Sequence, residues 1–456
     1  MELQNLALQN PWWQRKIEDD FHLQKLGKQK YQYSPSFLQV EELQQAETGI
    51  YTIIGPRQVG KTTFLKMLIR DLLAREEPHS LFYYSCENNT KEQLREVLLF
   101  YLQSIAPPGK KYLFLDEISL VRGWELVELE LYNKGMLQQA IIINSGSSSL
   151  NLKKSAERLP GRKGKGRLCF FFPLSFREFV FLVEKKASEI DKTPYAFLPL
   201  LDQLLEQYVR ASGFPSVINL WAQEQIDDAT YDIYKDWIEG EIAKAGRSVQ
   251  FAYQIFARIL ESLTSQLNWE SIAKRSSIRS HTTIADYADL LDSLFITKVV
   301  PQIGGDLRIN LAKNKKIYFY DHFLFSVIEK STLKIANYQN YYTQRLSEEV
   351  YFSRIVENLV FSNLLKYLAD KGFELTNTLF FWRSKTQQEV DFIVLVRKGI
   401  KKIVVPIEVK YRAQVEPSQI KTFRPFILSK NTLDHEKSIY PLSLFLFRLP
   451  AMAKLE

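Results

Sequence analysis

Cysteine is scarce in this sequence, and long apolar segments are missing. The 456 residues include two cysteines, Cys86 and Cys169, too few for a disulfide scaffold or a zinc ribbon. No apolar run approaches the length of about 18 residues that a transmembrane helix needs. The first residues, MELQNLALQNPWW, lack the basic start and apolar core of a signal peptide. We therefore expect a reduced, cytoplasmic protein that does not enter the membrane.

The residues that are present suit a globular protein of several domains. Apolar residues make up 46% and aromatic residues 13% of the chain, enough for packed cores. The net charge is +8, and it is concentrated between Lys153 and Arg167, where KKSAERLPGRKGKGR holds seven basic residues and one acid. Such a local excess favours a polyanionic partner such as DNA.

The segment GPRQVGKTT matches G-x-x-x-x-G-K-[ST], the loop that binds nucleotide phosphates. It follows IYTII (50–54), typical of a buried parallel strand, and precedes an amphipathic helix pattern over 63–74. Lys61 is expected to reach the outer phosphates and Thr62 to ligate Mg²⁺. A chance match in a loop is the alternative, and the flanking elements argue against it. The expected nucleotide contacts are Gly55, Pro56, Arg57, Gln58, Val59, Gly60, Lys61, Thr62 and Thr63.

Two acids follow the predicted strand 112–115. Asp116 is the candidate for the Mg²⁺ shell, and Glu117 for the base that orients the attacking water. A capped turn would look the same in isolation. The absence of an N/T-K-x-D motif favours ATP over GTP.

Polar and basic residues after strand 140–143 could complete the nucleotide site. Asn144 and Ser147 are candidate sensors of the γ-phosphate, although a Ser/Gly-rich turn would also explain them. Arg162 could act as an arginine finger in a neighbouring subunit, or it could contact a phosphate backbone or lie in a solvated loop. A finger of this kind implies a homo-oligomer, for which a hexameric ring is one form.

In the order of its motifs, the chain resembles AAA+-type ATPases of the archaeal-ATPase kind. The matching segments are 55–63, LFLDEI (113–118), GSSS (146–149), LPGR (159–162), PLSFREF (173–179), GFP (213–215) and KIYFYD (316–321). Another glycine usually precedes GFP in that family, and here Ser212 stands in its place. The family pairs a P-loop core with a C-terminal domain related to the PD-(D/E)xK nucleases.

The resemblance implies an α/β multidomain protein. We expect an N-terminal helical segment over 1–30, a P-loop ATPase core of the AAA+ type over 31–172 and a helical lid over 173–245. A winged helix over 246–330 and an α/β domain like that of restriction endonucleases over 340–456 would follow.

The winged-helix prediction also has direct support in the sequence. Three helical patterns cover 251–265, 269–277 and 280–294, and two strand patterns separated by Gly304–Gly305 come next. A DNA-binding role would use the start of the third helix and the basic residues before it. The candidate contacts are Lys274, Arg275, Arg279, His281 and Thr282. A winged helix that only packs within the protein is the alternative.

The C-terminal region holds a second group of acids. Glu357 lies in a helix pattern, and Asp391 interrupts the apolar strand EVDFIVLV, where an acid needs a partner. In KKIVVPIEVKYR, strand alternation puts Glu408 and Lys410 on one face. The alternative is an amphipathic hairpin whose charges face solvent.

The resemblance to the PD-(D/E)xK site assigns a role to each of these residues. Asp391, Glu408 and the carbonyl of Val409 would bind Mg²⁺, and Glu357 would be an outer or direct ligand. Lys410 would position the attacking water or stabilise the transition state. Oxygen ligands suit Mg²⁺, which would activate the water and neutralise the phosphodiester.

Together these patterns predict an ATP-dependent DNA-processing protein in which ATP hydrolysis is coupled to Mg²⁺-dependent cleavage of duplex or branched DNA. RNA is an alternative substrate. The second hypothesis is a regulatory or signalling ATPase whose C-terminal domain binds nucleic acid or protein without cleaving it.

Overall fold

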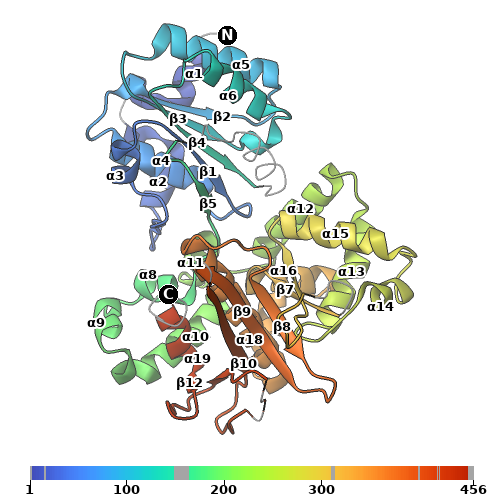
Figure 1. Ribbon diagram of the computed structural model, residues 1–456. Coiled ribbons are helices and arrows are strands. Elements are labelled where there is room, and N and C mark those ends of the chain that lie inside the picture. Colours follow the sequence, from blue (N-terminus) through green and yellow to red (C-terminus); the bar gives the residue numbers. More distant parts are fainter. Residues whose placement is uncertain are drawn as a thin grey trace. The chain divides into compact units, whose positions relative to one another are not determined.

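The structure is a computed structural model that divides into two compact units, residues 1–172 and 173–456 (Figure 1). We call them the N-terminal unit and the C-terminal unit. The described residues are 3–14, 17–147, 164–309, 314–398, 401–418, 420 and 422–449. Within these ranges, no helix combines the length and the apolar character that crossing a membrane requires.

The N-terminal unit alternates strands and helices, as the sequence predicts. Its strands are β1 (Gly49–Ile54), β2 (Leu81–Ser85), β3 (Lys111–Asp116), β4 (Ala140–Gly146) and β5 (Leu168–Phe170). Its α-helices are α1 (Leu3–Gln9), α2 (Phe21–Gly27), α3 (Val40–Gln45), α4 (Lys61–Leu72), α5 (Lys91–Phe100) and α6 (Trp124–Asn133). Short helical turns lie at Pro11–Trp13, Ile17–Asp19, Pro78–Ser80, Tyr101–Ile105 and Ile118–Leu120.

The five strands form one parallel sheet in the order β2-β3-β4-β1-β5, with helices on both faces (Figure 1). The strands are buried almost throughout, which explains their continuous apolar sequences. Because the sheet is parallel, the carboxyl ends of β1, β4 and β3 lie side by side. The loops after these three strands therefore meet at one edge.

The open edge of this sheet is covered by the start of the chain. β2 is an edge strand, and side chains from residues 9–13 satisfy its outer backbone groups. The Asn10 amide accepts from the Tyr83 N–H at 2.7 Å and donates to the Tyr83 carbonyl at 2.9 Å. The indoles of Trp12 and Trp13 both donate to the Leu81 carbonyl. This part of the expected helical segment 1–30 thus packs on the sheet.

The C-terminal unit begins with helices and ends with a mixed sheet. Its helices are α8 (Phe176–Val183), α9 (Ala187–Lys192), α10 (Leu198–Ala211), α11 (Pro215–Trp221), α12 (Asp228–Lys244), α13 (Val249–Glu261), α14 (Trp269–Lys274), α15 (His281–Ser293), α16 (His322–Leu333), α17 (Tyr338–Arg345), α18 (Glu349–Asp370) and α19 (Leu442–Arg448), with a 3-10 turn at Pro194–Phe197. Its strands are β6 (Thr297–Pro301), β7 (Lys315–Phe319), β8 (Leu379–Arg383), β9 (Glu389–Lys398), β10 (Lys401–Val409), β11 (Phe426–Ser429) and β12 (Ile439–Pro441).

The C-terminal sheet has the order β12-β11-β10-β9-β8. β8, β9 and β10 are antiparallel neighbours, as the predicted hairpin requires, whereas β11 and β12 continue the sheet in parallel. The ladder between β9 and β10 runs to Phe392 opposite Ile407, so Asp391 and Glu408 occupy the next position on the two strands.

The three helices α13, α14 and α15 are followed by the antiparallel hairpin β6–β7, in the predicted order. The hairpin is attached to the C-terminal sheet, because the Ile303 N–H donates to the Phe381 carbonyl of β8 at 2.9 Å. Ile303 is buried in one apolar cluster with Phe380 and Trp382. The long helix α18 holds the other strand, since the Asn358 amide accepts from the Phe319 N–H and donates to the Phe319 carbonyl.

Candidate functional site

The phosphate-binding loop joins β1 to α4 through a sharp turn. Gly60 has φ +103° and stands at the start of α4, in a conformation that favours glycine. A Cβ atom on Gly55 would come within 2.1 Å of the Phe171 carbonyl oxygen, so a side chain cannot be accommodated there without a backbone shift. The loop thus brings the N-terminus of α4, where backbone N–H groups attract anions, to the edge that the strand ends share.

Lys61 is buried at the start of α4 and is held mainly by the backbone. Its ammonium donates to the carbonyls of Gly55 and Pro56 at 3.1 and 3.0 Å and lies 3.7 Å from a Glu117 carboxylate oxygen. Burial lowers the pKa of Lys61, an effect that Glu117 and Asp116 oppose. A triphosphate would supply further negative charge to this lysine.

Three hydroxyl groups converge on Asp116, which is only 3% exposed. Thr62 Oγ1 donates to Asp116 Oδ2 at 2.6 Å and the Tyr83 hydroxyl donates to the same oxygen at 2.9 Å. Ser145 Oγ donates to the other oxygen, Oδ1. The predicted pair Thr62 and Asp116 is therefore assembled, and a hydroxyl beside a buried carboxylate is a donor set that fits Mg²⁺.

Glu117 adopts a left-handed backbone conformation, with φ 51°, directly after Asp116. Its carboxylate accepts from Ser147 Oγ at 3.1 Å, and its N–H donates to Ser145 Oγ at 3.2 Å. A non-glycine residue in this conformation is strained, and such strain is concentrated at functional sites. Ser147 therefore lies beside the acid pair, as expected for a candidate sensor.

Asn144, the other candidate sensor, contacts a different acid. Successive side chains of a strand alternate in direction, so Ser145 and not Asn144 reaches Asp116. The Asn144 amide donates to Glu128 of α6 at 2.8 Å. Burial raises the pKa of Glu128 to about 8, an effect that the Asn144 hydrogen bond opposes. Glu128 Oε2 and Asn144 Oδ1 are buried without partners among the described residues.

The other predicted residues of the loop lie around this group. Val59 and Pro56 are buried, and Gln58, with φ 63°, is exposed. Arg162 lies outside the described residues, as do most of the basic stretch 153–167 and Ser148 and Ser149 of the GSSS motif.

The acids of the C-terminal unit surround a lysine that the sequence analysis did not identify. Lys316 of β7 has a side chain only 1% exposed. Its ammonium lies 3.1 Å from Glu357, 2.6 Å from Glu389 and 2.9 Å from Asp391. Burial lowers the pKa of Lys316, but the acids, Asp391 foremost, raise it well above its usual value.

Both carboxylate oxygens of Asp391 are used within the protein. Oδ1 accepts from Lys316, and Oδ2 accepts from the Val409 N–H at 2.9 Å. Burial and Asp391 raise the pKa of Glu357 to about 7 against the opposing effect of Lys316. The Tyr318 hydroxyl also donates to Glu357 at 2.6 Å.

This geometry differs from the metal site that the resemblance implied. Lys316 stands among the acids, and within the described residues no group of three or more His, Cys, Asp or Glu side chains is arranged to hold a metal ion. The Val409 N–H donates to Asp391 Oδ2. The expected pairing of Glu408 and Lys410 on one face is present, with a distance of 3.0 Å between ammonium and carboxylate.

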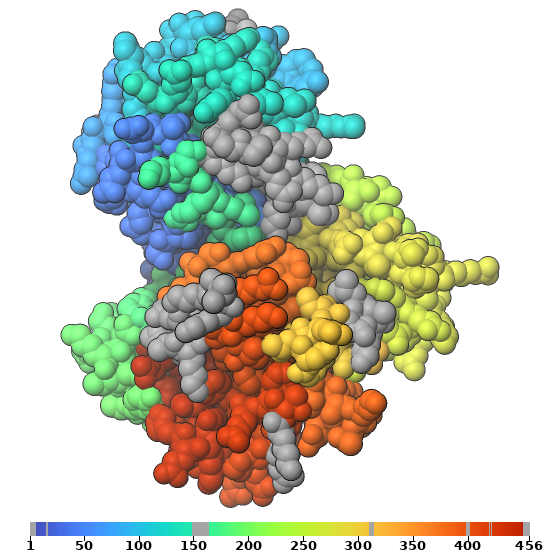
Figure 2. Space-filling model, in the orientation of Figure 1, coloured from blue at the N-terminus to red at the C-terminus, as the bar shows by residue number. Residues whose placement is uncertain are grey.

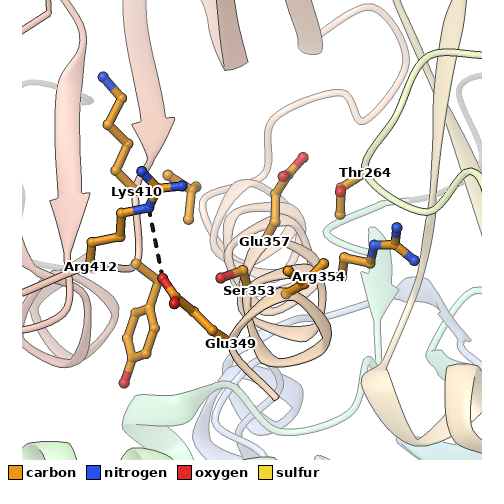
Figure 3. Close-up of a pocket in the computed structure, with 10 residues that line it drawn as sticks. Thr264, Glu349, Ser353, Arg354, Glu357, Lys410 and Arg412 are labelled. Atoms are coloured by element: carbon orange, nitrogen blue, oxygen red, sulfur yellow. Dashed lines mark ion pairs between the residues drawn. The ribbon is translucent and has the colours of Figure 1, made fainter. Parts of the chain in front are cut away.

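A cavity of about 480 Å³ opens beside this cluster, between α18 and the end of β10 (Figure 3). Arg412 reaches toward Glu349 across it, at 3.8 Å. Arg354 has no hydrogen-bond or ion-pair partner among the described residues. The lining residues are Thr264, Glu349, Val350, Ser353, Arg354, Glu357, Val409, Lys410, Tyr411 and Arg412.

The candidate DNA contacts lie at the start of α15 and in the turn before it, a region at the surface of the C-terminal unit (yellow in Figure 2). Arg275, Arg279, His281 and Thr282 are exposed. Lys274 is exposed as well, but its ammonium pairs with Glu270 one helical turn earlier, at 2.8 Å.

Several residues of the two sites had no motif to reveal them. Tyr83 and Ser145 lie on strands adjacent to or near the acid-bearing strand, and strand alternation could have indicated Ser145. Lys316 begins KIYFYD, and only the pairing of the hairpin with the C-terminal sheet shows that it meets Asp391.

Comparison with known proteins supports the N-terminal assignment. Residues 47–180 match a family model described as an AAA domain. Residues 202–338 and 352–442 match two models described as domains of unknown function (DUF8612 and DUF4143). No curated protein matches the chain. The fold, the site and the first match together define the N-terminal unit as a P-loop ATPase-like domain of the AAA kind.

Comparison with solved structures finds similarities at low identity and with TM-scores below 0.4. A Walker-type ATPase of Pyrococcus abyssi has 14% identity and a TM-score of 0.39, with 64% of this chain and 94% of that chain covered. The Aeropyrum pernix ORC2 protein, solved as ADPNP–ADP complexes, has 12% identity and a TM-score of 0.36, with 66% and 96% covered. The Thermotoga maritima RuvB Holliday junction branch migration motor has 14% identity and a TM-score of 0.31, with 60% and 87% covered.

Proposed function

We propose that the N-terminal unit binds and hydrolyses ATP and that the C-terminal unit binds DNA under the control of that reaction. The observation that carries the first part is the convergence of Lys61, Thr62 and Asp116 at the carboxyl edge of the sheet, with Thr62 and Asp116 2.6 Å apart. Lys61 would hold the outer phosphates in place of its present contacts to backbone carbonyls.

Thr62 and Asp116 are the residues that would hold Mg²⁺, which neutralises charge on the phosphates when it is bound. Glu117 would orient the attacking water and accept its proton, with Ser147 fixing the carboxylate. Asp116 is held by hydroxyl donors on both oxygens, so its orientation is set before substrate arrives.

The test is an ATP hydrolysis assay combined with nucleotide binding. Lys61→Ala should remove hydrolysis and weaken ATP binding, whereas Glu117→Gln should keep binding and lose hydrolysis by about 10²-fold or more, since it loses only the base. Lys28→Ala and Glu96→Gln, both at exposed positions, are the controls. Undiminished hydrolysis in Lys61→Ala would contradict the proposal.

Two features support DNA binding by the C-terminal unit. One is the cavity beside the carboxylate cluster, by which we mean Glu357, Glu389 and Asp391 around Lys316. The other is the group of exposed basic side chains before α15. Lys410, Arg412 and Arg354 line the cavity, while Lys316 already neutralises part of the adjacent acid charge. Phosphate groups are the ligands that such side chains recognise. The order of α13–α15 and β6–β7 suits a winged helix. The proposal also includes a homo-oligomer in which Arg162 of one subunit acts as an arginine finger at the ATP site of its neighbour.

Cleavage is a second candidate function, favoured by the distance of 3.0 Å between Lys410 and Glu408 beside the cavity. It would require Lys316 to leave Asp391 before a divalent ion could enter. Labelled linear, branched and single-stranded DNA, incubated with ATP and Mg²⁺ or Mn²⁺, distinguishes the two. Binding that weakens in Lys410→Ala without any cleavage by the wild type supports the regulatory ATPase; cleavage that disappears in Lys410→Ala supports the nuclease.

A further inference from the structure

Tyr83 belongs to no predicted motif, yet its hydroxyl contacts the candidate Mg²⁺ residue. The phenol donates to Asp116 Oδ2 at 2.9 Å, the oxygen that also accepts from Thr62. If Thr62 turns its oxygen toward a metal ion, Tyr83 is the remaining donor to that carboxylate oxygen. Residues that bind a metal-ligating carboxylate in this way tune its orientation and its affinity for the ion.

Tyr83 is in turn held by the start of the chain. Asn10 makes both hydrogen bonds to its backbone, at 2.7 and 2.9 Å. The Lys66 ammonium lies 3.4 Å from the centre of the Tyr83 ring, a cation–π contact. Lys66 pairs with Asp20 at 3.2 Å and donates to the Gln9 carbonyl at 3.2 Å. Residues 9, 10 and 20 thus fix both the backbone and the ring of Tyr83.

We propose that Tyr83 is a positioning residue for Asp116, and that Gln9, Asn10 and Asp20, acting on Tyr83 directly and through Lys66, set the orientation of this carboxylate toward Mg²⁺. The inference rests on the proposed ATP hydrolysis. A tyrosine that only filled the core would need its ring, not its hydroxyl, whereas a positioning residue needs the hydroxyl. Tyr83→Phe separates the two roles because it removes one oxygen and leaves the ring and its packing in place.

The chain offers a matched control. Tyr84 is the next residue of the same strand, and its hydroxyl donates to Asn89 at 2.8 Å and not to Asp116. Tyr84→Phe therefore deletes the same atom from the same strand without touching the acid. Both variants should unfold within a few degrees of the wild type, which a thermal scan checks before any functional comparison.

The experiment measures Mn²⁺ binding in the presence of ADP by the loss of the free-ion EPR signal, with hydrolysis rates in parallel. Tyr83→Phe should weaken Mn²⁺ binding about three- to tenfold, the net value of one ordinary hydrogen bond, and should raise the Mg²⁺ concentration for half-maximal hydrolysis by a similar factor. Tyr84→Phe should match the wild type. Lys66→Met should weaken Mn²⁺ binding less, and it should add nothing in the Tyr83→Phe background.

Mn²⁺ binding in Tyr83→Phe that equals the wild type overturns the positioning role and leaves the proposed ATPase standing. Additive losses in the Lys66 and Tyr83 double variant overturn the role of Gln9, Asn10 and Asp20. If the wild type binds neither ADP nor Mn²⁺ and hydrolyses no ATP, the proposed function fails, and this inference fails with it.

Discussion

The P-loop site and the C-terminal carboxylate cluster both place a buried lysine beside acidic side chains, but the two lysines are satisfied differently. Lys61 is held by two backbone carbonyls, and its nearest carboxylate is 3.7 Å away. Lys316 lies within 3.1 Å of three carboxylates. Lys61 can therefore exchange weak neutral contacts for a phosphate, whereas Lys316 has little to gain from a new partner. Similar residue types form a candidate phosphate-binding site in one unit and a cluster of ion pairs in the other.

The largest effect that this comparison predicts is on stability. Lys316→Met leaves three partly buried acids without their cation and should destabilise the C-terminal unit by about 3–5 kcal/mol. Lys61→Met should change stability little, because burial already disfavours the charge of Lys61. Lys330→Met, which breaks one partly exposed pair with Asp232, is the control and should cost about 1 kcal/mol or less. Denaturant unfolding measures all three, and a fully stable Lys316→Met would refute the role of Lys316.

A second prediction concerns Glu128, whose pKa burial raises to about 8. The folded protein keeps this proton while the unfolded chain, with a pKa near 4.5, releases it, so stability is lost as pH rises through that interval. Glu128→Gln keeps the hydrogen bond from Asn144 and removes this loss. The variant should be more stable than the wild type by on the order of 5 kcal/mol above pH 8, and the gain should vanish below pH 4.5.

Glu130 provides a control of opposite sign on the same helix. Arg95 and then Lys134 lower the pKa of this exposed acid to about 2. Its stabilising contribution is present above the unfolded pKa and is lost as pH falls toward 2. Glu130→Gln should therefore be slightly less stable than the wild type at neutral pH. A Glu128→Gln variant whose stability parallels the wild type at every pH would show that Glu128 is ionised when folded.

In both sites, the contacts that could be predicted from the sequence are the local ones. Lys61, Thr62 and Asp116 were predictable because a short loop and one strand end bring them together whatever the rest of the fold does. Glu408 and Lys410 were predictable as neighbours because strand alternation is local. The order of the three helices and the hairpin before residue 320 followed from periodicity as well.

The remaining parts depend on contacts between distant segments. Lys316 meets Asp391 only because the β6–β7 hairpin joins β8, a pairing that no local pattern encodes. Asn144 was placed just after a strand expected to end at residue 143, so the direction of its side chain could not be inferred. The strand continues to Gly146, so Asn144 and Ser145 lie within it and point to opposite faces of the sheet. The role of Tyr83 could not be predicted, because it depends on the position of the edge strand β2 beside β3 and on the contacts of Asn10 with that strand.

A third prediction compares two groups of basic residues in DNA binding. Arg275→Ala combined with Arg279→Ala should weaken binding several-fold and lower the salt slope of log K by about 2, because each arginine is expected to neutralise one phosphate. Lys274→Ala should have a smaller effect because Lys274 already pairs with Glu270. Fluorescence anisotropy at several salt concentrations measures both. An unchanged slope in the double variant would assign this surface to packing or to another partner.

The smallest predicted effect contrasts two strained residues, one in each unit. Glu117 (φ 51°) carries a carboxylate at the candidate nucleotide site. Ser212 (φ 76°, ψ 177°) precedes Gly213 and occupies a position at which the family that the chain resembles usually has a glycine. Ser212 lies in a backbone region that only glycine adopts without strain, so Ser212→Gly should relieve about 1–3 kcal/mol. It also loses the hydrogen bond from the Phe214 N–H to Ser212 Oγ, worth about 1 kcal/mol.

The net result should be a gain of roughly 1 kcal/mol in the free energy of unfolding, with ATP hydrolysis unchanged. Ser216→Gly in α11 is the matched control. It makes the same substitution in a helix, where glycine costs about 1 kcal/mol, and should destabilise the protein. A loss of stability in Ser212→Gly would mean that the Phe214 hydrogen bond outweighs the strain. In that case the conformation of Ser212 would be explained by its hydrogen bond, and only the strain at Glu117 would be explained by the proposed function.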